Sequence, residues 1–131
     1  MHQTTTATAT HPLADRWVAM ARDGGRPPHL GVLTRVRPWT APDGRTWWSW
    51  VLRTHTGHLV GSSPLADTVA LTRADRALIG RARGAMTRRK RWLESIVDPG
   101  TGIVPRAVAA GLADIAHDRA LLGDLPDEER P

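Results

Sequence analysis

The chain has 131 residues, no cysteine and a formal net charge of +5 at pH 7, which fits one small domain and excludes disulfides and thiolate metal sites. It contains no apolar run long enough for a membrane span and no apolar leader segment. We therefore expect a basic, cytoplasmic protein with no membrane partner. The excess of arginine over lysine among its 18 basic residues is typical of a GC-rich genome, such as those of actinobacteria.

The N-terminal part of the chain predicts a disordered tail and a short helix. Residues 1–10 form a tract rich in Thr and Ala, which lacks the apolar content of a folded segment. Pro12 then stands at a favourable first helical position, and the glycines at 24–25 would stop a helix. The apolar residues between these points recur at helical spacing, namely Leu13, Trp17, Met20 and Ala21.

The middle of the chain predicts a three-stranded antiparallel meander. Apolar and polar residues alternate over residues 30–37, 46–53 and 58–62, as they do in half-buried strands. The Pro-Asp-Gly sequence at 42–44 and the Thr-Gly sequence at 56–57 supply residues that favour turns. Each strand therefore pairs with the next one along the chain.

Two helices are predicted in the C-terminal half. Residues 72–75 resemble a capping box, with Asp in place of the usual Glu, and a helical pattern continues from there to Val97. A second helical pattern runs from Pro105 to Gly123.

The predicted fold class is therefore α+β, with a short N-terminal helix, a three-stranded antiparallel meander and two C-terminal helices. We expect a single domain over residues 11–123, followed by an acidic, flexible end over residues 124–131.

The first predicted C-terminal helix is strongly basic. Between residues 76 and 91 it carries seven basic residues and no acid, which leaves a net charge of −2 for the rest of the chain. A one-sided basic helix is typical of proteins that bind phosphates, although a solvated helix face accounts for the same pattern. Gly80 and Gly84 share the charged side and would let a phosphate backbone approach closely. The candidate phosphate-binding residues are Arg76, Arg81, Arg83, Arg88, Arg89, Lys90 and Arg91.

The same helix has an apolar stripe on its other side. At about 100° per residue, that stripe includes Met86, Trp92, Leu93 and Ile96. Arg89 is the one candidate cation that falls on the apolar side.

A second basic surface is predicted on one side of the meander. If the first two strands pair, this side gathers Leu33, Arg35, Arg37, Trp47, Val51 and Arg53. Single-stranded nucleic acids stack on exposed tryptophan beside arginine, and a twisted basic sheet also fits a DNA groove. The alternative is that a helix covers this side and Trp47 belongs to the core. The candidate binding residues here are Arg35, Arg37, Trp47 and Arg53.

An aromatic strand, a turn and a further strand followed by a helix form a pattern over residues 46–90. Its markers are Trp48, Trp50, Leu52, Gly57, Ser62 and Ser63. This order resembles the YegP-like small ββα domains, a resemblance that implies fold more than activity. It is also similar to the arm-type DNA-binding domains of phage-like integrases, whose sheet enters the major groove, but this chain has no recombinase catalytic region.

These features predict a small nucleic-acid-binding accessory or regulatory protein that contacts the phosphate backbone of DNA or RNA. The alternative is a protein interaction module of a plasmid or phage accessory system, whose basic helix meets an acidic partner. The sequence has no phosphate-binding loop, nucleophile elbow or paired-carboxylate motif, so we expect no enzyme activity and no cofactor. His55 and His58 lie three residues apart across a turn, a spacing that predicts no metal site.

Overall fold

The structure is a computed structural model that describes residues 10–97, 100–102 and 104–127. The predicted disordered tail, apart from Thr10, lies outside the described residues, and so do residues 128–131 of the predicted acidic end.

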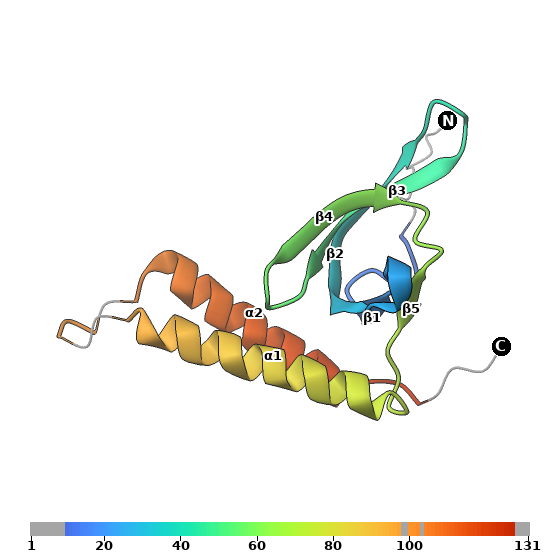
Figure 1. The fold of residues 1–131 in the computed structure, drawn as a ribbon. Coiled ribbons are helices and arrows are strands. Elements are labelled where there is room, and N and C mark those ends of the chain that lie inside the picture. The colour runs from blue at the N-terminus through green and yellow to red at the C-terminus, as the bar shows by residue number, and fades with distance from the viewer. Residues whose placement is uncertain (1–9, 98–99, 103, 128–131) are drawn as a thin grey trace, which may run out of the picture. The chain divides into compact units, whose positions relative to one another are not determined.

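The chain is α+β, with a five-stranded antiparallel sheet followed by two helices (Figure 1). It forms two compact units: Met1–Ala70 contains the sheet, and Leu71–Pro131 contains the helices. The single domain over residues 11–123 stays a prediction, because two compact units can still fold cooperatively. Neither helix in the described part of the chain is long and apolar enough to cross a membrane.

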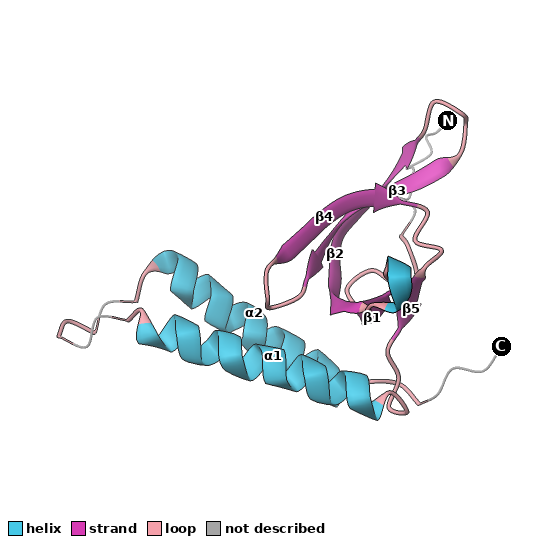
Figure 2. Ribbon diagram, in the orientation of Figure 1, coloured by secondary structure: helices cyan, strands magenta, loops and turns pink. Residues whose placement is uncertain are grey.

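The strands follow the order β4-β3-β2-β1-β5 across the sheet, and all neighbouring pairs are antiparallel (Figure 2). Their bounds are β1 Trp17–Met20, β2 His29–Thr40, β3 Thr46–Arg53, β4 His58–Ser63 and β5 Thr68–Ala70. The predicted meander corresponds to β2, β3 and β4. The prediction omits β1 and β5, which extend the sheet beyond β2.

The prediction of an N-terminal helix is wrong, because Trp17–Met20 is strand β1 and the nearest helical element is the 3-10 turn η1, Asp23–Gly25. All four residues of β1 are buried. Val18 and Met20 belong to the core cluster, so the alternate residues of the strand face the other side of the sheet. A short apolar run that is buried on both faces satisfies helical spacing as well as strand spacing, which explains the error.

A β-bulge in β2 decides which side chains share a face. The register between β2 and β3 shifts just before Arg37, and Arg35 has a positive φ of 52°. Leu33 pairs with Leu52 in the core, whereas Arg37, beyond the bulge, pairs with Ser49 on the opposite face. The prediction that Leu33 shares a face with Arg37 is therefore wrong, because one extra residue reverses the alternation.

One face of the sheet carries the core of the sheet unit. Its buried members are Val18, Met20, Leu33, Trp50, Leu52 and Leu65, and the side chains packed against them are Leu13, Val36, Trp48 and Leu59. The indole N–H of Trp50 donates to Ser63 Oγ at 3.3 Å. Its ring covers Gly61, where a Cβ would come within 2.8 Å of the ring. Trp48 and Trp50 therefore belong to the core, and Trp17 is buried in β1, whereas Trp39 is exposed.

The helices α1 (Arg76–Ser95) and α2 (Arg106–Gly123) form an antiparallel hairpin (Figure 1). Both predicted C-terminal helices are confirmed, although α1 begins at Arg76, after the capping-box residues. The two helices approach closely at Gly111, where an added Cβ would lie 2.9 Å from Leu93 Cδ1. A glycine at this point lets the side chain of Leu93 pack against the backbone of α2.

The turn before α1 is fixed by its own side chains. The Asp75 carboxylate accepts a hydrogen bond from the Thr72 N–H at 2.8 Å, and the Thr72 hydroxyl accepts one from the Ala74 N–H at 3.3 Å. Of the two bonds expected of a capping box, the one from the Thr72 N–H to the Asp75 carboxylate forms, whereas the Asp75 N–H donates to the Thr72 carbonyl at 3.0 Å and not to its hydroxyl.

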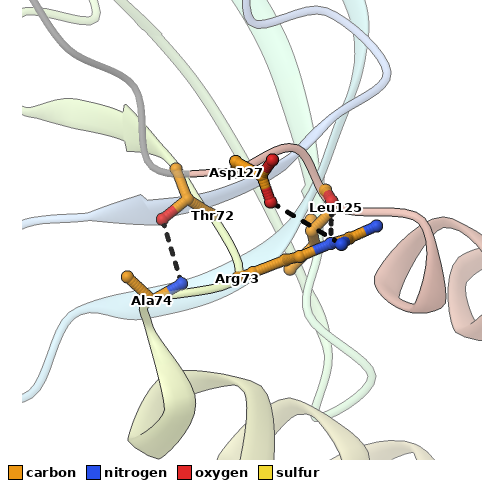
Figure 3. A network of polar contacts seen from close by, with 5 residues as sticks. All are labelled: Thr72, Arg73, Ala74, Leu125 and Asp127. Carbon is orange, nitrogen blue, oxygen red and sulfur yellow. Dashed lines mark hydrogen bonds and ion pairs between the residues drawn. The ribbon is translucent and has the colours of Figure 1, made fainter.

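Arg73 ties this turn to the chain that follows α2 (Figure 3). Its Nε donates to the Leu125 carbonyl at 2.9 Å, and its Nη1 lies 3.6 Å from an Asp127 oxygen. Leu125 itself is buried. The first residues of the predicted acidic end are thus held against the start of α1.

Candidate nucleic-acid interface

The cations of α1 form two rows along the helix. Arg76, Arg83 and Lys90 recur every seven residues, which is close to two helical turns, so they lie nearly on one line. Arg81 and Arg88 form a second row with the same spacing. Neighbours within a row are about 10 Å apart along the helix axis. All five side chains are exposed, as a phosphate-binding surface requires.

A strip of small residues separates the two rows. Ala77, Gly80 and Gly84 lie on this strip, together with the exposed Arg91. A Cβ at Gly80 would meet nothing within 4 Å, so the helix backbone is open there. At Gly84 the guanidinium of Arg88 lies across the strip, 3.2 Å from where a Cβ would stand. An anion that reaches the strip therefore meets cations on both sides.

The positive charge of α1 is poorly neutralised. The helix contains a single acid, Glu94, in its last turn. Ion pairs with carboxylates of the described residues are absent for Arg76, Arg83, Arg88, Lys90 and Arg91. Their charges consequently add to a positive potential that attracts polyanions and depends on ionic strength.

Arg89 differs from the other cations of the helix. It is half-buried, and its guanidinium carbon lies 4.8 Å from the centre of the Trp92 ring, within the range of a cation–π contact. The prediction placed Trp92 and Ile96 on the apolar stripe, but they are 55% and 42% exposed. The buried residues of α1 are Ala82, Met86 and Leu93. The Trp92 ring therefore holds the Arg89 guanidinium at the surface.

Arg119 adds a cation that sequence reasoning missed. It lies on α2, and its Nη2 donates to Thr87 Oγ1 on α1 at 3.5 Å. The sequence separates these two residues by a whole helix, so only the pairing of the helices brings Arg119 to the basic surface.

A second surface lies on the β2–β4 part of the sheet, on the face away from the core. We call it the outer sheet face. Its side chains are Thr34, Arg35, Arg37, Trp39, Trp47, Ser49, Val51, Val60 and Ser62. Most of them line a shallow, open groove of about 460 Å³. Arg35 and Arg37 are exposed on this face, and it carries no acidic side chain.

Trp39 and Trp47 form an aromatic pair on the outer sheet face. They are direct partners in the β2–β3 register, and their ring centres are 6.1 Å apart at an angle of 43°. Trp39 is 40% exposed, whereas Trp47 is half-buried. The Trp47 indole N–H is buried and has no hydrogen-bond partner among the described residues. Trp39 is absent from the predicted site, because the predicted first strand ends at Arg37.

Arg53, the remaining predicted residue, lies at the other end of the same strand face. It is half-buried and pairs in register with Val32, which is fully buried, and with His58. The structure thus brings Arg35, Arg37 and Trp47 together with Trp39 and leaves Arg53 at a more enclosed place.

An open cavity of about 700 Å³ lies elsewhere in the sheet unit, next to η1. Arg22, Arg26 and His29 line it together with Asp23 and Asp67. Burial, with a smaller contribution from the charge of Arg22, lowers the pKa of His29 below 6.5. The carboxylates and guanidinium groups that line this cavity offset one another's charge, so the cavity favours neither anions nor cations. Within the described part of the chain, no cluster of three or more His, Asp or Glu side chains is arranged to hold a metal ion.

Comparisons of the chain with protein-family models, with curated proteins and with solved structures found no match. The resemblance of residues 46–90 to YegP-like domains and to the arm-type domains of integrases therefore stays a prediction.

Proposed function

We propose that the chain is a nucleic-acid-binding accessory or regulatory protein that contacts the phosphate backbone through α1. The observation that carries this proposal is the arrangement of the α1 cations: two exposed rows flank an open strip, and a single acid stands at the far end. Each phosphate that such a surface neutralises releases condensed counterions, which gives affinity without sequence preference.

The test removes one cation from each row and one from the strip, as Arg83→Gln, Arg88→Gln and Arg91→Gln in one variant. Glutamine keeps much of the side-chain length and the helix propensity. We expect weaker binding to labelled duplex DNA and a plot of log K against log salt that is shallower by roughly 2 to 3, since each lost phosphate contact contributes about 0.9 on B-DNA. Fluorescence anisotropy at several salt concentrations measures both quantities.

The matched control removes three exposed arginines outside this surface, as Arg22→Gln, Arg26→Gln and Arg106→Gln. It lowers the net charge by the same amount, so a general charge effect would change both variants alike. A salt slope that is unchanged in the α1 variant, or equally changed in the control, overturns the assignment to α1.

One observation favours the alternative of an acidic protein partner. Trp92 and Ile96 are exposed apolar side chains on the same helix as the cations, and a mixed apolar and basic surface is typical of protein interfaces. This reading predicts no binding of DNA or RNA at low salt and an affinity for an acidic protein that survives nuclease treatment.

A further inference from the structure

We propose that the outer sheet face binds single-stranded DNA, with Trp39 stacking on a base and with Arg35 and Arg37 contacting the flanking phosphates. This inference rests on the proposed function for its ligand class, nucleic acid, but it involves residues outside α1. It also names a strand state, which the cations of α1 cannot select by charge alone.

The register of the sheet places three kinds of chemistry in successive rows. Trp39 and Trp47 form the aromatic row near the β2–β3 turn. The next row across the strands contains Arg37, Ser49 and Ser62. The third row is formed by Thr34, Val51 and Val60, with Arg35 of the bulge beside it. Figure 2 shows the three strands that carry these rows lying side by side.

The bulge is what makes this surface basic. Without the extra residue, Arg37 would fall on the same face as Leu33, which points into the core. The positive φ of Arg35 is unfavourable for an ordinary side chain, so the fold accepts local strain at the position that sets this register.

An exposed tryptophan favours unpaired bases over a duplex. In a duplex the faces of the bases are already stacked and only their edges are accessible, whereas a single strand offers each base as a stacking surface. Trp39 is 40% exposed and rests against Trp47, so its ring is available and held from one side. Arginines beside an aromatic ring then contact the backbone that connects the bases.

The third row, which contains Val51 and Val60, favours DNA over RNA. Val60 is 76% exposed, and it pairs in register with Val51. Two of the neighbouring hydroxyl groups are already engaged, because Thr34 Oγ1 donates to the Val51 carbonyl at 3.1 Å and the Ser49 hydroxyl donates to the Arg37 carbonyl at 3.5 Å. A 2′-hydroxyl group would lie against valine there, whereas deoxyribose or a thymine methyl group fits an apolar contact.

The charge of the face is complementary to a polyanion. Arg35 and Arg37 make no ion pair with a described carboxylate. The acid in the adjoining β2–β3 turn, Asp43, is bound instead to Arg45 of the same turn at 3.4 Å. Phosphates can therefore approach the groove without displacing an internal salt bridge.

The experiment measures binding of the full chain to labelled oligo(dT), oligo(U) and a DNA duplex, each alone in an anisotropy titration. The variants are Trp39→Leu and Arg37→Gln, with Trp39→Phe as a conservative substitution that keeps a ring. We expect Trp39→Leu to weaken oligo(dT) binding by about fivefold or more, which is the lower end for loss of one stacked base. Duplex binding should change much less, and Trp39→Phe should retain most of the oligo(dT) affinity.

The matched control is Trp92→Leu, which removes an exposed tryptophan from the helix unit. It should leave the ratio of oligo(dT) to duplex affinity unchanged. Because Trp39 lies at the surface, its variants should keep the wild-type circular dichroism, and Arg37→Gln provides an independent test if one of them does not. The α1 variant should weaken all three ligands together, so failure of the α1 proposal is seen separately from failure at the sheet.

Three outcomes would overturn the inference. One is equal weakening of oligo(dT) and duplex binding by Trp39→Leu, which would make the face a general surface. Another is loss of the preference for oligo(dT) in Trp92→Leu, which would move stacking to the helix. The third is tighter binding of oligo(U) than of oligo(dT) by the wild-type chain, which would assign the surface to RNA.

Discussion

The basic helix and the outer sheet face differ in how their charges are placed. On α1, six exposed basic residues lie along two rows and the narrow open strip between them. On the sheet, two arginines accompany two tryptophans and two valines in fixed rows. A dense, flexible set of cations supplies affinity for any phosphate backbone, whereas a rigid face with few charges can distinguish between ligands.

The two units also differ in how their interiors are built. The sheet unit has a contiguous core that includes large side chains such as Trp50 and Leu52. In the helix unit, the buried residues of α1 are Ala82, Met86 and Leu93, and those of α2 are Val108, Ile115, Asp118 and Leu122. We therefore expect most of the stability of the chain to reside in the sheet unit.

The largest effect on stability is expected from truncating a core residue in either unit, as Leu33→Ala or Met86→Ala. Both side chains are fully buried, so each change should lower the free energy of unfolding by about 2–5 kcal/mol. Far-UV circular dichroism reports mainly the helices, and tryptophan fluorescence reports mainly the sheet unit, which contains all the tryptophans except Trp92.

If the chain is one cooperative domain, both probes should give the same lowered transition in both variants. Val69→Ala, at a residue that is 62% exposed, serves as the control and should change the stability by no more than about 0.5 kcal/mol. Separate transitions, each shifted by only one of the variants, would contradict the predicted single domain.

The sequence was most informative where one pattern acted alone. The strand predicted over residues 46–53 has the observed bounds of β3, because its alternation is uninterrupted and a turn precedes it. The helix predicted between Pro12 and the glycines at 24–25 is wrong, since the apolar run Trp17–Met20 fits both periodicities and its assignment depends on pairing with distant strands. β5 has three residues, which is too short for any period to emerge.

The residues of the candidate site were likewise predictable in one element and not in the other. The exposure of the α1 cations could be predicted, because charge on a regular helix falls where the helical period puts it. Which residues share the outer sheet face could not be predicted, because the bulge beside Arg35 reverses the alternation and no residue type in the sequence indicates the bulge. Trp39 is the site residue that the prediction omits, since it lies beyond the bulge and beyond the end of the predicted strand.

A smaller effect on stability, and a direct test of the strip, is expected at Gly80. Gly80→Ala should stabilise the chain by up to about 1 kcal/mol, because the position is an exposed helix interior with open space around the added Cβ. Gly80→Leu should keep the fold and weaken duplex binding, because the larger side chain occupies the strip between the cation rows. Thermal melting and anisotropy titration measure the two effects.

The control Ala113→Leu, at an exposed position of α2, should leave duplex binding unchanged. If Gly80→Leu also leaves duplex binding unchanged, the nucleic-acid backbone does not approach the strip.

The smallest effect is a dependence of the sheet unit on pH. The pKa values of His11 and His29 lie below 6.5, mainly because burial disfavours the charged imidazole. The unfolded chain therefore takes up protons first as the pH falls, so the stability that these histidines contribute is complete above pH 6.5 and is lost below it. At His11 the loss has a visible cause, because its Nδ1 accepts a hydrogen bond from the Leu13 N–H at 3.0 Å and protonation would remove that acceptor.

The measurement is the melting temperature at about pH 7.5 and at about pH 5. The drop in melting temperature between these two pH values should be larger in the wild-type chain than in a His11→Gln, His29→Gln double variant. His58→Gln, which changes an exposed histidine, should behave like the wild type, and an equal fall in all three proteins would place the acid sensitivity in the carboxylates instead.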